Sequence, residues 1–355
     1  MQSDETAVRV GIVGLGGIAQ FHAERLVETD ATLAVGMDVD EAARDSFAEA
    51  FGVETVGDAA ALYDRVDAVL VTTPNRFHEE YAVGALEAGC DVLVEKPLAH
   101  TLDSAERIAE AAAEAPGFLT VGFHTRFAPP VEVLQHRIDD GDLGEVRHVE
   151  ANYLRRRGVP GRGTWFTEAA VAGGGAVIDL GVHAVDLALS LHGFPEVVEV
   201  SAVTRSEFGG RDDYAYLHMW GEDGADEFDV EDSASAFVRL ADGRTISLET
   251  AWASNREPDQ TFHVRGTDGG ARFDKAAGEL TLYDASTAGG HHLADTTVET
   301  RDDDPHRAEQ EAFLAAVRAG EPPERNTVEQ ALTVQRVVDA IYRSAERGEA
   351  VSLRE

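Results

Sequence analysis

An aspartate and a histidine stand four positions apart after a run of three glycines, within residues 173–186. If the chain is helical from about Asp179, then Asp179 and His183 share one helix face, with Asp186 close by. An imidazole can take a hydroxyl proton near neutral pH, and a neighbouring carboxylate can orient the ring and raise its basicity. A lone histidine on such a helix is more often a core residue, so this interpretation depends on the rest of the chain.

A lysine stands at the end of an apolar run, in the triplet Glu95-Lys96-Pro97. The chain has 30 lysines and arginines together, but only two are lysines, Lys96 and Lys275. An ammonium group beside a substrate hydroxyl can hold it by a hydrogen bond and stabilise a developing alkoxide. Pro97 stiffens the backbone that leaves the run. Lys96 is therefore a candidate catalytic and substrate-binding residue.

A glycine-rich turn near the start has the spacing of a dinucleotide-binding fingerprint. The apolar run from Val8 leads into Gly14-Leu15-Gly16-Gly17-Ile18-Ala19 and then into a helical pattern. Gly14 permits a tight turn, Gly16 lets the backbone approach a pyrophosphate, and Ala19 replaces the third glycine. The N–H groups at Gly17 and Ile18 would face the phosphates at the start of the helix.

Asp38 ends the second apolar run, 19 residues beyond Ala19. An acid in this place can accept hydrogen bonds from both ribose hydroxyls of NAD, and it repels the 2′-phosphate of NADP. The sequence therefore favours NAD over NADP.

A second cofactor segment, Thr72–His78, follows the strand expected at Ala68–Thr72. It lies at the carboxyl edge of the sheet, where cofactors bind in folds of this kind. Asn75 and His78 would contact the nicotinamide ribose or cap the next helix, and both interpretations stay open for Asn75. This segment, with Glu95 and Lys96, adds the following candidates to the cofactor site: Thr73, Pro74, Asn75, His78.

The elements that position these residues alternate in type over residues 1–125. Short apolar runs bounded by turn residues predict buried parallel strands, and the stretches between them are helical in pattern. The expected strands are Val8–Val13, Thr32–Met37, Ala68–Thr72, Asp91–Glu95 and Leu119–Phe123, and the helices are Ala19–Glu28, Glu41–Phe51, His78–Ala88 and Leu102–Ala115. This alternation predicts a doubly wound parallel sheet, a Rossmann domain.

Residues 126–355 follow a different pattern, which predicts an α/β domain for substrate binding and oligomerisation. Strands that alternate apolar and polar residues favour an open, mostly antiparallel sheet. They are Arg147–Tyr153, Glu199–Ser206, Ser235–Leu240 and Thr245–Ala253, after a helix at Pro130–Asp140. A last helix, Thr327–Arg347, opens on a capping-box pattern and is expected to pack back against the rest. The acidic segment Gly221–Asp232 is expected to be a solvated loop.

The charge balance excludes two classes of partner. With 66 acidic and 30 basic residues the net charge is -36, which repels nucleic acid phosphates and anionic membranes. Few lysines and many acids are typical of proteins adapted to high salt, where counterions screen the self-repulsion; a merely acidic protein is the plainer alternative. No apolar run approaches the length of a membrane helix, and the first residues do not resemble a signal peptide, so a cytoplasmic location is expected.

Cysteine and histidine usage gives no indication of a metal site. Cys90 is the only cysteine, which excludes an intrachain disulfide, and it is expected to be a small core residue. His291-His292 has no third ligand at metal spacing, so no metal is assigned.

The chain resembles the glucose-fructose oxidoreductase and myo-inositol dehydrogenase (Gfo/Idh/MocA) family. The resemblance covers nearly the whole chain, through the glycine fingerprint, the Thr-Pro-Asn segment with His78, Glu95-Lys96-Pro97 and Asp179…His183. It implies a Rossmann domain followed by an α/β domain, with Lys96, Asp179 and His183 as catalytic residues. Members commonly have asparagine where His124 stands, followed by an arginine matched here by Arg126.

The resemblance implies a dehydrogenase that oxidises a hydroxyl of a sugar, polyol, cyclitol or sugar acid. His183 would remove the proton, Lys96 would position the oxygen, and Asp179 would orient the histidine or bind an adjacent hydroxyl. Two alternatives remain: a redox-neutral enzyme with tightly bound NAD, which cleaves glycosides or epimerises sugars, and a sugar sensor without catalysis.

The sequence specifies the substrate pocket and the oligomeric state least well. A basic island, Arg155-Arg156-Arg157 with Arg162, could meet a substrate carboxylate or phosphate, or pair with surface acids or a partner subunit. The candidate substrate-binding residues are Lys96, Arg126, Tyr153, Arg155, Trp165, Asp179 and His183. The open sheet needs a cover for its exposed face, so a homodimer or homotetramer is expected.

Overall fold

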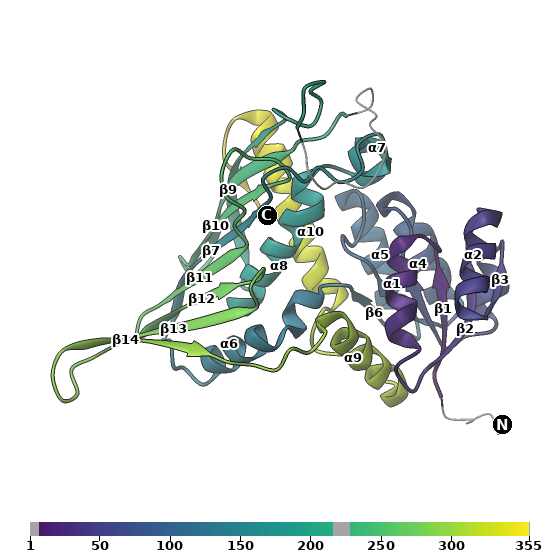
Figure 1. Ribbon diagram of the computed structural model, residues 1–355, viewed down its shortest axis with the longest axis horizontal. Helices are drawn as coiled ribbons and strands as arrows, with labels where there is room; N and C mark the ends of the chain where they lie inside the picture. Colours follow the sequence, from purple (N-terminus) through teal and green to yellow (C-terminus); the bar gives the residue numbers. More distant parts are fainter. Residues whose placement is uncertain (1–6, 216–227, 355) are drawn as a thin grey trace. The chain divides into compact units, whose positions relative to one another are not determined.

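The computed structural model describes residues 7–215 and 228–354, which form two compact units (Figure 1). The first unit holds the chain up to His124 together with Asp304–Leu332, and the second holds Thr125–Asp303 together with Thr333–Glu355. From the sequence we expected a first domain of residues 1–125 and a second of residues 126–355. The observed first unit also contains Asp304–Leu332.

The first unit is built on a six-stranded sheet in the order β3-β2-β1-β4-β5-β6, and all its pairs are parallel. The strands are β1 (Arg9–Val13), β2 (Thr32–Met37), β3 (Glu54–Val56), β4 (Ala68–Val71), β5 (Asp91–Val94) and β6 (Leu119–Val121). The order reverses between β1 and β4, so a switch point lies beside the glycine turn. Cys90 is buried just before β5, and burial raises the pKa of its thiol to about 11, which confirms a core residue.

Several of the longer helices of the first unit begin at side-chain caps. Asp40 accepts the N–H of Ala42 at the start of α2, and Thr101 accepts that of Ser104 at the start of α5. The elements are α1 (Gly17–Leu26), α2 (Glu41–Phe51), α3 (Ala60–Tyr63), η1 (Asn75–Phe77), α4 (His78–Glu87) and α5 (Leu102–Glu114). The returning segment adds α9 (Pro305–Ala319), which has Pro305 in its first turn and ends at Gly320 in the left-handed conformation.

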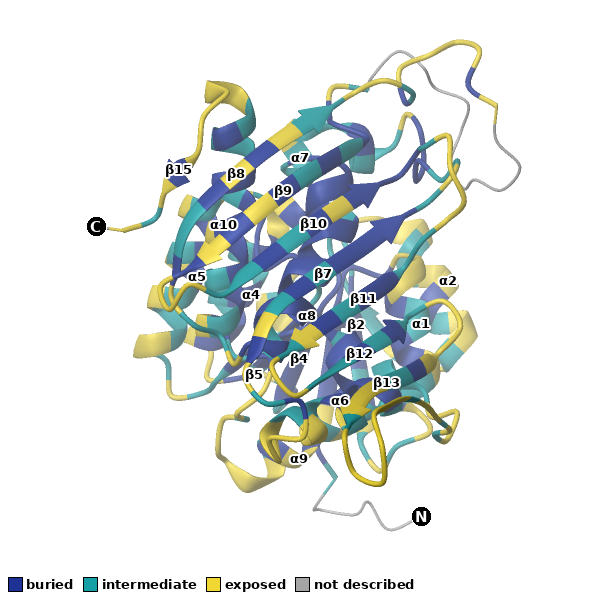
Figure 2. Cartoon of the chain, turned by 90° about the vertical axis from the view of Figure 1, so that its left-hand side faces the viewer, coloured by how far each residue is buried: buried dark blue, intermediate teal, exposed yellow. Residues whose placement is uncertain are grey.

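The second unit is built on a nine-stranded sheet in the order β14-β13-β12-β11-β7-β10-β9-β8-β15. Every pair is antiparallel except β7 with β10, so the expected mostly antiparallel sheet is confirmed. Its strands are β7 (Val146–Leu154), β8 (Val197–Arg205), β9 (Ser233–Leu240), β10 (Thr245–Ala251), β11 (Thr261–Gly266), β12 (Gly269–Asp274), β13 (Glu279–Ser286), β14 (His292–Val298) and β15 (Val351–Ser352). Figure 2 shows buried and exposed residues alternating along β8 and β9, the pattern of a sheet with one covered face.

Helix α8 (Val182–Leu191) packs against β7 and β10 and forms the core of this unit (Figure 1). The segment Ala169–Leu191 is long and apolar enough to cross a membrane by length and composition alone, although it carries Asp179 and Asp186. Because 89% of its apolar window is buried inside the protein, we interpret it as a core helix. The remaining elements are η2 (His124–Phe127), α6 (Pro129–Asp139), η3 (Trp165–Thr167), α7 (Ala169–Ala172), η4 (Val177–Gly181) and α10 (Val328–Arg347).

Candidate active site

The glycine turn after β1 has room for a pyrophosphate. Gly14 has φ +88°, and a Cβ there would lie 2.7 Å from Cγ2 of Thr73, so only glycine fits. At Gly16 and Gly17, by contrast, a Cβ would meet nothing within 4 Å. Helix α1 begins at Gly17 without a side-chain cap, so its first N–H groups face this open space. These features fit the phosphates of a dinucleotide.

Asp38 lies just beyond β2 and also braces the glycine turn. Its Oδ2 accepts the N–H of Leu15 over 2.7 Å, and its Oδ1 accepts that of Asp40 over 2.9 Å. Each carboxylate oxygen has a second lone pair, so Asp38 can still accept hydrogen bonds from ribose hydroxyls. Arg44 donates to the carbonyls of Asp38 and Val39 over 2.8 and 3.1 Å, which places a cation near the ribose position.

His78 is fully buried between the two loops that follow β4 and β5. Its Nδ1 lies 2.9 Å from the carbonyl of Pro97, and its Nε2 lies 2.9 Å from that of Thr73. Burial lowers the pKa of His78, whereas the two carbonyls oppose that shift. With both nitrogens against backbone, His78 fixes the two loops, which is a different role from the predicted ribose contact. The N-cap position of α4 is Phe77, whose side chain makes no cap hydrogen bond, and the buried Asn75 lies two residues earlier, at the start of η1.

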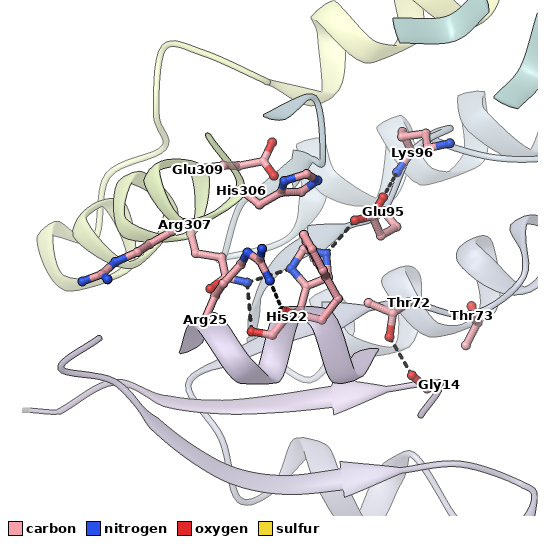
Figure 3. A network of polar contacts seen from close by, with 12 residues as sticks. Gly14, His22, Arg25, Thr72, Thr73, Glu95, Lys96, His306, Arg307 and Glu309 are labelled. Carbon is pink, nitrogen blue, oxygen red and sulfur yellow. Dashed lines mark hydrogen bonds and ion pairs between the residues drawn. The ribbon is translucent and has the colours of Figure 1, made fainter. Parts of the chain in front are cut away.

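Glu95 and Lys96 follow β5 directly and share a hydrogen bond. Oε2 of Glu95 accepts the backbone N–H of Lys96 over 3.0 Å, and its Oε1 lies 2.6 Å from Nε2 of His22 (Figure 3). Sequence reasoning did not identify His22, because its link to Glu95 spans 73 positions. The backbone of Lys96 is therefore held by a carboxylate that is itself held from α1.

Asp179 lies in a turn of π-helix, η4, that leads directly into α8. Such turns are rare and occur frequently at functional sites. Two preceding glycines allow a close approach: a Cβ at Gly174 would lie 1.9 Å from Oη of Tyr342, and one at Gly175 would lie 1.9 Å from the carbonyl of Glu231. The glycine run is thus explained by packing around the turn that carries Asp179.

Trp252 and Arg155 are the neighbours of the Asp179 carboxylate. The fully buried Trp252 donates its indole N–H to Oδ2 over 2.9 Å, and Nη1 of Arg155 lies 3.9 Å from the same oxygen. Asp179 thus has an N–H donor on one side and a positive charge nearby. Trp252 lies just beyond β10, 73 residues from Asp179, and no local sequence pattern predicted this contact.

Glu231 supports the same turn and corrects the expectation of a solvated acidic loop at Gly221–Asp232. Its carboxylate accepts the N–H groups of Gly175 and Val177 over 2.9 and 2.8 Å and the hydroxyl of Tyr342 over 3.0 Å. Asp232 is also buried, and its Oδ2 accepts three backbone N–H groups, from residues 207, 208 and 209. Residues 216–227 lie outside the described part of the chain, but the end of the segment is buried because its acids bind backbone donors.

His183 lies in the first turn of α8, largely buried, beside Tyr153 of β7. The two rings have centroids 6.4 Å apart. The hydroxyl of Tyr153 lies 3.4 Å from Nζ of Lys275, which is also 5.1 Å from the ring centroid. We did not predict Lys275 as a site residue from the sequence, although it is one of only two lysines in the chain. Tyr153, His183 and Lys275 form one cluster of the second unit.

Arg126 and Asp186 form a buried bidentate ion pair. Nε of Arg126 donates to Oδ2 of Asp186 over 2.9 Å, Nη2 bonds Oδ1, and both side chains are almost completely buried. The guanidinium also lies 4.6 Å from the ring of Phe194. Asp186 therefore binds Arg126 within the second unit, and a substrate contact of Arg126 stays a prediction.

The basic island separates into residues with different surroundings. Arg157 donates to the carbonyls of Arg156 and Ser254, and the buried Arg162 donates to that of Arg211. Both guanidinium groups also lie over the ring of Tyr214. The partners of Arg157 and Arg162 include backbone carbonyls, aromatic rings and, for Arg157, the side-chain amide of Asn255. Arg155 is the member of the island that lies beside Asp179. Trp165 opens η3 and stacks on Phe166, with ring centroids 3.9 Å apart.

Within residues 7–215 and 228–354, no group of three or more histidines, cysteines and acids is placed to hold a metal ion.

Comparison with known proteins identifies relatives along the whole chain. A family model described as "Oxidoreductase family, NAD-binding Rossmann fold" matches residues 8–123, and one described as "GFO/IDH/MocA C-terminal domain" matches residues 131–272. The D-glucoside 3-dehydrogenase of Escherichia coli (strain K12) is 34% identical over 354 residues, which cover 98% of this chain and 97% of that protein. The D-xylose 1-dehydrogenase (NADP(+)) 2 of Haloferax volcanii is 28% identical over 97% of this chain and 98% of its own.

Among solved structures, a levoglucosan dehydrogenase in complex with NADH matches with a TM-score of 0.86. The match covers 98% of this chain and 100% of that chain at 23% identity. At this level of identity the likeness establishes the fold.

Proposed function

Because this chain belongs to the Gfo/Idh/MocA family of oxidoreductases, we propose that it is an NAD-dependent dehydrogenase that oxidises a secondary or anomeric hydroxyl of a sugar, polyol or cyclitol. The observation that carries the proposal is Asp179, whose carboxylate is held by Trp252 one turn before His183. A relative of similar length is named as a D-glucoside 3-dehydrogenase, which favours a pyranoside ring as the substrate.

The proposed roles follow from the chemistry of each side chain. His183 takes the hydroxyl proton, and the ammonium group of Lys96 holds the same oxygen and stabilises negative charge as it develops. Asp179, which contacts Trp252 and Arg155, orients the histidine or binds an adjacent hydroxyl. NAD, when bound at the glycine turn, supplies the hydride acceptor. Tyr153 and Lys275 offer a hydroxyl and an ammonium group to other substrate oxygens.

Replacement of Lys96 by methionine and of His183 by asparagine tests these roles. We expect each variant to lose two orders of magnitude or more in turnover while its affinity for NAD is kept, because general acid–base and electrostatic contributions are about that large. Arg157→Gln is the control, since its guanidinium binds backbone and aromatic rings. Near-native turnover of both test variants would refute the assignment.

The charge composition supports a proposal about the working environment. Acids outnumber basic residues 66 to 30, and the two lysines both belong to the candidate site. We infer adaptation to high salt, and we expect stability and turnover to rise as potassium chloride is raised from near zero to molar concentration. A steady fall over this range would contradict it.

An exposed apolar set on the second sheet supports a homo-oligomer. Val203, Phe237, Tyr283 and Leu293 are exposed large hydrophobic residues on four of its strands. Burying such a face against a second copy would remove it from water. Light scattering at the working salt concentration should therefore give the mass of a dimer or tetramer, and a monomer would refute this.

A further inference from the structure

The carboxylate of Glu95 is enclosed within the first unit by groups from three different elements. His22 approaches from α1 with a 2.6 Å contact to Oε1, and the N–H of Lys96 occupies Oε2. His306 of α9 also faces it (Figure 3). Its ring centroid lies 6.4 Å from that of His22 and 3.6 Å from that of His124, on which it stacks. His124 thus has a packing partner in α9.

Gln310 of α9 determines which nitrogen of His22 carries the proton. Its Nε2 lies 2.7 Å from Nδ1 of His22 and 3.2 Å from the carbonyl of His22. An amide nitrogen beside a carbonyl must donate, so Nδ1 of His22 is an acceptor and carries no proton. The proton therefore sits on Nε2, and His22 is a neutral ring that donates to Glu95.

The two histidines beside Glu95 consequently do not neutralise its negative charge. Burial lowers the pKa of His306 to about 4, so this ring is also neutral near pH 7. Burial acts to raise the pKa of Glu95, but the contact with His22 and, after it, the positive charge of Lys96 hold this pKa low. Arg25, the nearest arginine of α1, is paired with Asp304 over 2.7 Å. Glu95 is thus an anion whose adjoining cation is Lys96.

Building on the proposed role of Lys96, we propose that Glu95 is a positioning residue, oriented by His22 and Gln310, which fixes the backbone of Lys96 and supplies the counter-charge that keeps its ε-amino group cationic. The arrangement ties the helix of the glycine turn and the returning helix α9 to the strand that ends at Lys96. It also accounts for a buried acid, His22 and Gln310 that the proposed chemistry itself does not use.

The rarity of lysine makes a direct test possible without substrate or cofactor. Protein grown with isotope-labelled lysine gives two side-chain NMR signals, which Lys275→Arg assigns. In Glu95→Gln we expect the pKa measured for Lys96 to fall by about one unit or more, because a nearby opposite charge shifts a pKa by about that amount. The signal of Lys275 is the internal reference. Glu79→Gln is the matched control, a glutamate paired with Arg107 in the same unit, and it should leave Lys96 unchanged. An unchanged Lys96 titration in Glu95→Gln would overturn the proposal.

Gln310→Leu provides a second variant should Glu95→Gln fail to fold. Without the amide, Nδ1 of His22 is free to bind a proton, and the resulting cation would neutralise Glu95. The pKa measured for Lys96 should fall in this variant too, and no change would count against the proposal.

Activity separates this inference from the proposed function. If Lys96→Met is inactive while Glu95→Gln keeps wild-type turnover and the same alkaline limb of its pH profile, the positioning role is wrong and the dehydrogenase proposal stands. If Lys96→Met keeps its turnover, the dehydrogenase proposal fails, and the NMR titration still reports whether Glu95 governs Lys96.

Discussion

The indole N–H of Trp252 donates a hydrogen bond to Oδ2 of Asp179 over 2.9 Å, from a ring that is completely buried. Since a carboxylate with a fixed donor keeps both its charge and its direction, this contact determines how Asp179 can act on its neighbours.

Trp252→Phe should therefore reduce kcat/KM while the protein stays folded. A hydrogen bond to a charged group contributes about 1.5–3 kcal/mol, which corresponds to about ten- to hundredfold in rate. Steady-state kinetics measures the loss, and affinity for NAD should be unchanged because Trp252 belongs to the second unit, whereas the candidate cofactor residues belong to the first. A variant with wild-type kinetics would show that this bond has no catalytic consequence.

Asp38→Ser should change the cofactor preference. The carboxylate is lost, so repulsion of a 2′-phosphate disappears, and Arg44 lies close enough to the end of β2 to attract it. We expect kcat/KM with NAD to fall by about tenfold and that with NADP to rise, from the loss of about one charged hydrogen bond. Asp40→Ser, which keeps a good cap for α2, should keep the wild-type preference. A preference that is equal in Asp38→Ser and the wild type would contradict the role of Asp38.

Two glycines of the turn should respond differently to alanine. Gly14→Ala should lower the free energy of unfolding by about 1–3 kcal/mol, because its positive φ and its contact with Thr73 exclude a side chain. Gly16→Ala should leave stability unchanged but weaken binding of NAD, since the methyl group enters the open space kept for phosphates. Urea unfolding and calorimetric titration separate the two effects. Unchanged NAD affinity in Gly16→Ala would place the pyrophosphate elsewhere.

Stability should fall as the solution is acidified from about pH 6.5 toward pH 4. Burial lowers the pKa of His192 and of His306 to about 4 from an ordinary value of 6.5. In this window the unfolded chain binds protons that the folded chain does not, so the folded state is disfavoured by about 1–2 kcal/mol per histidine at pH 5. Urea unfolding at pH 7.5 and at pH 5 checks this. Both pH values lie about one unit or more above the folded pKa of the two histidines. His192→Gln should flatten the dependence, whereas His136→Gln, at an exposed position on α6, should not. Equal slopes in the two variants would argue against the assignment.

The sequence predicted the first unit well because buried parallel strands are short apolar runs that local pattern reveals. It missed helix α9 and strands β3, which has three residues, β11 and β12. It also missed β13 and β14, most of whose residues are exposed or half-buried. The glycine turn and the Lys96 triplet were found because their chemistry is local.

The missed site residues act over long sequence separations. Trp252 reaches Asp179 and Glu95 reaches His22 across 73 positions each, and Gln310 reaches His22 across 288. Asp186 was expected beside the catalytic pair, but it binds Arg126, 60 positions away. Only packing in three dimensions selects such partners.

The most direct test of the central claim is reduction of NAD by the purified protein at high salt with a panel of pyranosides, free hexoses, pentoses, inositols and sugar acids. We predict continuous, substrate-dependent formation of NADH with at least one sugar or cyclitol, and none with the His183→Asn variant. Sugar binding or glycoside cleavage without net NADH would contradict it and favour a sensor or a redox-neutral enzyme.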